Sequence, residues 1–213
     1  MKTPDNFNLN SGLEGKLEIL NNKINEAKAF RDRLGKGMDE GIIDAVGLFN
    51  AIGFNTTMSC EGHSENGNPG PYLHFEAENK PSEEFIGEAN KKAELVNKYN
   101  LNKESNQETR SKISDEYEEY LNSINYARTP EFIAWKEANE EIKNKLQTLL
   151  DEFYVDKNIN KLTKVSVRKI GGAVRLDTVP KDSKDTKDRL VERQREFADF
   201  VEFLKQKYLL GTF

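Results

Sequence analysis

The stretch that decides the fold is FNTTMSCEGHSENGNPGPYLHFEA, residues 54–77. Residues 54–59 include β-branched and apolar side chains, which is typical of a strand. Residues 61–71 contain three glycines and two prolines, a composition that excludes regular secondary structure. Residues 72–77 alternate, as a strand with one buried face does. The stretch therefore predicts two strands joined by a loop that begins directly after Cys60.

Similar patterns on either side complete the predicted core. A second strand pair is expected at residues 164–168 and 173–177, with its turn at Gly171-Gly172. Apolar residues at three- and four-residue spacing predict helices at 12–38, 39–52 and 185–208. Gly53 stands where helices often end with a glycine. We therefore predict an α/β (α+β) fold in which a small sheet of hairpins is packed by helices.

Residues 81–157 carry helical patterns throughout and are predicted to form a long helical hairpin inserted into this core. The core itself would comprise residues 12–80 and 158–213, preceded by a flexible tail at 1–11. Residues 81–160 hold 17 acidic and 11 basic side chains. Such acidic helices would repel tRNA, because nucleic-acid binding requires clustered cations. They offer a surface for self-association, so a homo-oligomer through residues 81–157 is an expectation.

The composition indicates a soluble protein of the cytoplasm. Hydrophobic residues make up 36% of the chain and charged residues 32%, with a net charge of −5. The sequence holds no apolar run long enough to span a bilayer and no hydrophobic signal region. A single cysteine excludes an intramolecular disulfide and fits a reducing compartment. We expect no membrane partner.

The chemically distinctive residues are clustered. The only cysteine and both histidines, Cys60, His63 and His74, fall within 15 residues around the glycine-rich loop. One interpretation is a zinc site formed by these three side chains, with an open fourth position. Zinc-dependent hydrolysis would be the corresponding activity.

Other interpretations of the same segment remain open. Cys60 could be a nucleophile with His63 as its base and Asp177 as a third member. Alternatively, the segment is a loop whose backbone amides approach an anionic or planar ligand, and the small residues that would permit this approach are Ser59, Gly62, Ser64, Gly67 and Gly70. Cys60 could also be a small core residue without a functional role.

A second candidate group lies on the later strand pair. Arg168 and Arg175 flank the turn and could bind a phosphate or carboxylate. Asp177 follows on the same predicted strand. As strand residues, the two arginines could equally be edge charges that discourage pairing with other sheets.

Two segments together resemble a known family. TTMSCEGH, residues 56–63, is similar to the Thr-x-x-Ser-Cys-x-Gly element of the tRNA wybutosine-synthesis methyltransferase family, and Val165-Ser-Val-Arg168 with Arg175-Leu-Asp177 resembles that family's later strand pair. The first segment also resembles a Ser-Cys-x-Gly-His motif of uncharacterised bacterial and phage proteins. The resemblance implies a pocket for S-adenosylmethionine and a modified guanosine. It places these residues at that pocket: Ser59, Cys60, Gly62, Arg168 and Arg175.

The leading hypothesis from the sequence is therefore a pocket for a nucleotide- or nucleoside-type small molecule. Its catalytic candidates are Cys60 and His63, and its ligand-binding candidates are Ser59, Glu61, Gly62, His74, Arg168, Arg175 and Asp177. If the protein is an enzyme, S-adenosylmethionine-dependent methyl transfer is the first expectation. The alternatives are a non-catalytic protein that senses or sequesters such a molecule, and the zinc hydrolase.

Overall fold

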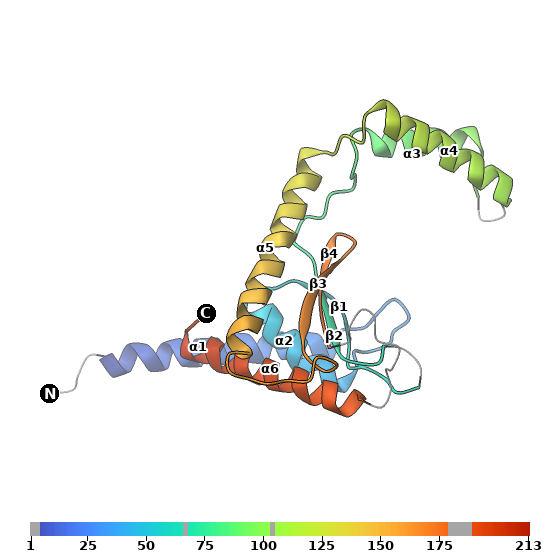
Figure 1. Ribbon diagram of the computed structural model, residues 1–213. Helices are drawn as coiled ribbons and strands as arrows, with labels where there is room; N and C mark the ends of the chain where they lie inside the picture. The colour runs from blue at the N-terminus through green and yellow to red at the C-terminus, as the bar shows by residue number, and fades with distance from the viewer. Residues whose placement is uncertain (1–4, 66–67, 103–104, 179–188) are drawn as a thin grey trace. The chain divides into compact units, whose positions relative to one another are not determined.

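The computed structural model describes residues 5–65, 68–102, 105–178 and 189–213 (Figure 1). The described strands form one four-stranded antiparallel sheet in the order β1-β2-β4-β3. The elements, in chain order, are α1 (Asp5–Ala29), the short 3-10 helix η1 (Glu40–Ile42), α2 (Ile43–Ala51), β1 (Thr56–Cys60), β2 (Tyr72–Phe75), α3 (Glu88–Lys98), α4 (Gln107–Ser123), α5 (Pro130–Phe153), β3 (Ser166–Ile170), β4 (Ala173–Asp177) and α6 (Leu190–Leu210). The predicted α+β class is confirmed.

The chain divides into two compact units. The first comprises residues 1–77 and 139–213, and the second comprises residues 78–138. The division falls inside α5, so residues 139–157 belong to the first unit rather than to the predicted insertion. The reason is burial: Leu146, Leu149, Leu150 and Phe153 of α5 are part of the core of the first unit.

That core lies on one face of the sheet. Alternate strand residues Leu73, Phe75, Val174 and Leu176 are fully buried. They pack against side chains from four helices, namely α1, α2, α6 and the second half of α5. Because side chains alternate along a strand, the intervening residues of β2 and β4 must face the other way. The polar side chains of these two strands therefore gather on the face opposite the core.

The bounds of the first helix differ from the sequence prediction. The backbone of α1 is helical from Asp5, where a flexible tail was expected up to residue 11, and the helix ends at Ala29 rather than near residue 38. The expected start of the last helix at residue 185 lies outside the described residues, and α6 is described from Leu190. In the described parts of the chain, no helix is both long enough and apolar enough to cross a membrane.

The predicted turn into β1 is confirmed. Gly53 has a φ of +91°, and the Phe54 N–H donates to the Phe49 carbonyl at 2.9 Å. A left-handed residue with this long return hydrogen bond is a common helix C-terminus. It turns the chain from α2 directly into β1, which ends at Cys60.

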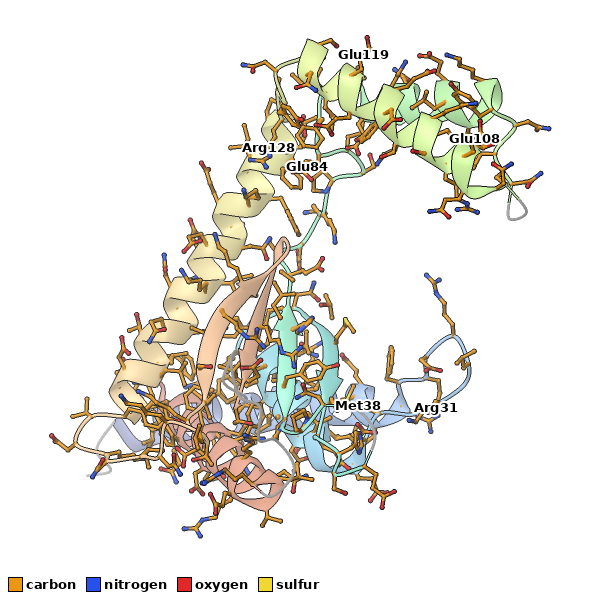
Figure 2. All side chains as sticks on the ribbon, turned by 45° about the vertical axis from the view of Figure 1, so that its right-hand side comes forward. Arg31, Met38, Glu84, Glu108, Glu119 and Arg128 are labelled. Carbon is orange, nitrogen blue, oxygen red and sulfur yellow. The ribbon has the colours of Figure 1, made fainter. Side chains whose placement is uncertain are left out.

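The second unit is held together by polar contacts as well as by packing. The Tyr117 hydroxyl of α4 donates to the Glu88 carboxylate of α3 at 2.6 Å. Arg128 and Glu84, labelled in Figure 2, form an ion pair of 3.1 Å. Tyr117 therefore links α3 and α4.

Candidate functional site

The loop after β1 brings three potential metal ligands together. One ligand atom each from Asp39, Cys60 and His63 lies within 4.8 Å of the others. His63 Nε2 is 3.3 Å from Asp39 Oδ2. Asp39 precedes η1, and its place beside Cys60 depends on the chain segment between α1 and α2. The sequence therefore identified two of the three residues and missed Asp39, which lies 21 positions before Cys60 and carries no local signal.

His74 lies outside this group, although the sequence placed it among the metal ligands. Cys60 pairs with Tyr72 across the β1–β2 ladder, and His74 is two positions farther along β2. Two strand residues span roughly 7 Å. His74 Nε2 instead lies 3.4 Å from Arg175 Nη1.

Gly62 determines the course of the loop. Its φ is +87°, and a Cβ there would come within 2.8 Å of the Gly70 backbone. The loop is closed by the His63 N–H, which donates to the Asn68 carbonyl at 2.8 Å. The Gly62 N–H donates to Cys60 Sγ at 3.3 Å. A glycine at this position thus allows His63 to turn back towards Cys60 and Asp39.

The surroundings of Cys60 are acidic. Burial raises the pKa of the Cys60 thiol; the Gly62 N–H opposes this effect, and the carboxylates of Asp39 and Glu61 add to it. A reactive cysteine normally needs cations or a helix N-terminus to lower its pKa. The thiol is therefore protonated at neutral pH, which disfavours the nucleophilic interpretation and favours a bound cation.

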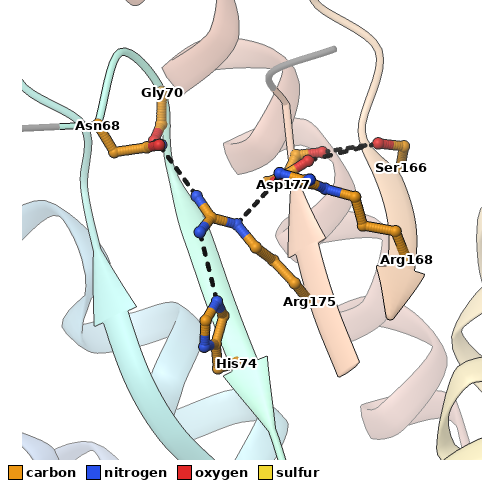
Figure 3. A network of polar contacts seen from close by, with 7 residues as sticks. All are labelled: Asn68, Gly70, His74, Ser166, Arg168, Arg175 and Asp177. Atoms are coloured by element: carbon orange, nitrogen blue, oxygen red, sulfur yellow. Dashed lines mark hydrogen bonds and ion pairs between the residues drawn. The ribbon is translucent and has the colours of Figure 1, made fainter. Parts of the chain in front are cut away.

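A second group of polar side chains occupies the same face of the sheet (Figure 3). Asp177 is fully buried, and its Oδ2 lies 2.6 Å from Arg168 Nη2 and 2.7 Å from Arg175 Nε. Asp177 therefore balances the charge of one of the two arginines. Its carboxylate faces these two arginines, whereas the group that faces His63 is Asp39.

Arg175 directs its guanidinium at protein groups, and its side chain is only 13% exposed. Its Nη2 donates to Asn68 Oδ1 at 2.9 Å, and its Nη1 faces His74 Nε2. Because a guanidinium can only donate, Nε2 of His74 is the acceptor and its proton resides on Nδ1. Burial, and then the charge of Arg175, lowers the pKa of His74, so the ring is neutral at pH 7.

Tyr72 connects the two groups. It pairs with Cys60 on one side and with Asp177 on the other, and the Arg175 guanidinium lies 3.9 Å from the centre of its ring. Burial raises the pKa of the Tyr72 hydroxyl, so this group stays protonated and can donate a hydrogen bond. Tyr72 is not among the residues predicted from the sequence, although its alternation with His74 places both side chains on one face.

Of the other predicted residues, Ser59 and Glu61 point away from this face and Arg168 lies on it. Ser59 alternates with Cys60 along β1 and therefore lies on the opposite face of the sheet. Glu61 turns towards η1, where its Oε2 accepts the Gly41 N–H at 2.7 Å. Arg168 keeps a partly exposed side chain at 34%, so it is the arginine of this face that solvent or a ligand can reach.

Comparisons with known proteins add no assignment. No family model matches the chain, and neither a curated protein nor a solved structure matches it.

Proposed function

We propose that this protein binds zinc through Asp39, Cys60 and His63 and acts as a metal-dependent hydrolase. The observation that supports this proposal is the convergence of one carboxylate, one thiol and one imidazole within 4.8 Å. This donor set suits zinc, and three protein ligands are the usual number for a catalytic zinc site. Ligand atoms around a tetrahedral zinc lie about 3.3–3.8 Å apart, given metal–ligand distances of 2.0–2.3 Å. The 3.3 Å between His63 and Asp39 already meets this requirement.

The neighbouring side chains fit a role in substrate binding. When bound, zinc supplies Lewis-acid chemistry and activates water. The chain contributes the Tyr72 hydroxyl next to Cys60, which can donate to a substrate oxygen. The Arg175 guanidinium contacts Asn68, His74 and Asp177. Because it also packs on the Tyr72 ring, it keeps that ring in place.

The metal content of the purified protein tests this function. We expect about one zinc ion per chain by mass spectrometry. Asp39→Asn and His63→Ala should lose the metal, because each removes one of only three protein ligands. Glu40→Gln, which changes an exposed carboxylate beside Asp39, is the matched control and should retain it.

The His74→Ala variant distinguishes the two proposed ligand sets. Retained zinc supports Asp39 as the third ligand. Zinc lost in His74→Ala but kept in Asp39→Asn would restore the set expected from the sequence. A protein that binds no zinc even when the metal is added would overturn the hydrolase proposal.

A second candidate is the binding of a nucleotide- or nucleoside-type molecule on the polar face of the sheet. The partly exposed guanidinium of Arg168 and the ring of Tyr72 beneath Arg175 support it. S-adenosylmethionine is the first ligand to test, because of the methyltransferase resemblance. An Arg168→Ala variant should bind adenine nucleotides or S-adenosylmethionine more weakly by calorimetry, whereas Lys169→Ala, on the opposite face, should not. Turnover would then separate a methyltransferase from a protein that only senses or sequesters its ligand.

A further inference from the structure

The three proposed metal ligands come from two separate segments of the chain. Cys60 and His63 belong to β1 and the loop after it, whereas Asp39 lies directly before η1. Aspartate at such an N-cap position usually accepts a backbone N–H of the helix. Asp39 makes no capping hydrogen bond there, and its carboxylate lies 3.3 Å from His63 instead. The ligand set is therefore complete only while the two segments are held against each other.

Glu61, the residue after Cys60, joins these two segments. Its Oε2 accepts the Gly41 N–H at 2.7 Å, two positions beyond Asp39. The first N–H groups of a helix have no partner within the helix, and a side chain commonly satisfies them. At η1 this acceptor is not the local Asp39 but Glu61, which lies 20 positions after Gly41. The exchange leaves the Asp39 carboxylate available to face His63.

The main chain around Glu61 is held in turn by α6. Gln194 Nε2 donates to the Glu61 carbonyl at 3.1 Å. The neighbouring Arg193 is fully buried, and its Nη1 donates to the Pro69 carbonyl at 3.0 Å. α6 thus contacts the loop after β1 near both of its ends. Because the backbone at Glu61 is fixed in this way, the bond from its side chain to Gly41 sets the position of the segment that carries Asp39.

We propose that Glu61 is a positioning residue of the metal site, which holds Asp39 beside Cys60 and His63 through its hydrogen bond to the Gly41 N–H. This inference rests on the proposed zinc binding. Without the bond, Asp39 would no longer be fixed beside the other two ligands. Loss of a group that orients a metal ligand typically lowers metal affinity about 10–100-fold. In this role Glu61 acts on the metal only through Asp39.

Zinc affinity, measured by competition with a coloured chelator, tests the proposal on the full chain. Glu61→Ala should weaken zinc binding at least about tenfold. Glu61→Gln should stay within about threefold of the unmodified protein, because an amide oxygen can still accept the Gly41 N–H. Glu83→Ala removes a carboxylate that accepts the Ala89 N–H at 3.2 Å in the second unit, and it should leave zinc affinity unchanged.

Gly41→Ala displaces the Glu61 carboxylate without removing its charge. A Cβ at Gly41 would come within 2.6 Å of Glu61 Oε2. We expect zinc affinity to fall about tenfold, as in Glu61→Ala. Gly15→Ala, at a position in α1 where a Cβ meets no atom within 4 Å, is the matched control and should not change it.

Cobalt(II) in place of zinc reports the ligands directly, and circular dichroism confirms that each variant is folded. At saturating cobalt, the absorption that arises from the Cys60 thiolate should persist in Glu61→Ala. The visible bands depend on coordination geometry and should change, because Asp39 is displaced. A loss of stability alone would not alter these bands in a folded, saturated protein.

The outcomes separate this inference from the proposed function. An unmodified protein that binds no zinc would overturn the metal site and this inference with it. Equal zinc affinity in the unmodified protein, Glu61→Ala and Gly41→Ala would overturn the positioning role alone. An equal loss in Glu61→Gln and Glu61→Ala would also overturn it, since Glu61 would then act through its charge or as a direct ligand.

Discussion

At the residue scale, the buried carboxylate of Asp177 explains why the two arginines do not form a simple anion site. A fully buried charge is stable only when it is paired and hydrogen-bonded. Arg168 donates to Asp177 Oδ2 from both Nε and Nη2, and Arg175 lies within ion-pair distance of the same oxygen. The arginines therefore first stabilise the fold. Only Arg168 retains enough exposure to meet a ligand, and sequence spacing could not distinguish it from Arg175.

Gly62 gives a prediction at the same scale, with Gly53 as its matched control. Both have positive φ, but only at Gly62 would a Cβ approach backbone atoms closely. Gly53→Ala should destabilise the protein by about 1 kcal/mol through backbone strain alone. Gly62→Ala should cost at least about 3 kcal/mol, because overpacking adds to the strain. Urea unfolding measures both values, and equal losses would show that the Gly70 contact yields at little cost.

At the scale of elements, the helices of the second unit depend on one carboxylate. Burial raises the pKa of Glu88, but hydrogen bonds from Lys92, Tyr117 and two backbone N–H groups outweigh this effect and hold its pKa at about 2. The N–H groups belong to Glu84 and Phe85, which precede α3. Glu88 thus joins the segment before α3, α3 itself and α4. The helical periodicity predicted these helices, but it gave no sign of this contact.

The stability of the second unit should accordingly fall in acid. Since the pKa of Glu88 is lower in the folded state than its usual 4.5, its contribution is complete above pH 4.5 and is lost as the pH falls towards 2. The single tryptophan, Trp135, is buried in this unit and reports its unfolding by fluorescence. Glu88→Gln should lower the unfolding free energy at pH 7 by about 2 kcal/mol and flatten the acid dependence. Glu108→Gln, at an exposed ion pair with Lys112, should do neither.

At the scale of the whole molecule, the two chain positions that border the second unit lie next to each other. The Ala77 N–H donates to the Asn139 side chain at 2.9 Å, and these residues border the second unit on either side. The proposed metal ligands and the sheet belong entirely to the first unit. An insertion whose ends meet can be removed with little loop-closure cost.

Replacing residues 78–138 with a short glycine–serine linker should therefore leave the first unit folded and able to bind zinc. Circular dichroism and metal content would measure these two properties. If the helices mediate self-association, analytical ultracentrifugation should show an oligomer for the full chain and a monomer for the shortened one. Loss of cooperative unfolding in the shortened chain would instead show that the first unit requires the second.

Local patterns in the sequence predicted most of the elements and their turns. Periodicity and glycine placement predicted the two strand pairs, the helix end at Gly53 and the loop after Cys60, because these features depend on neighbouring residues. The clustering of Cys60 with His63 likewise followed from local spacing. Tertiary structure alone decided that Asp39 joins them, that His74 turns to Arg175, and that β1 lies at an edge of the sheet. Those arrangements depend on strand order and on packing between segments far apart in the chain, which no local pattern encodes.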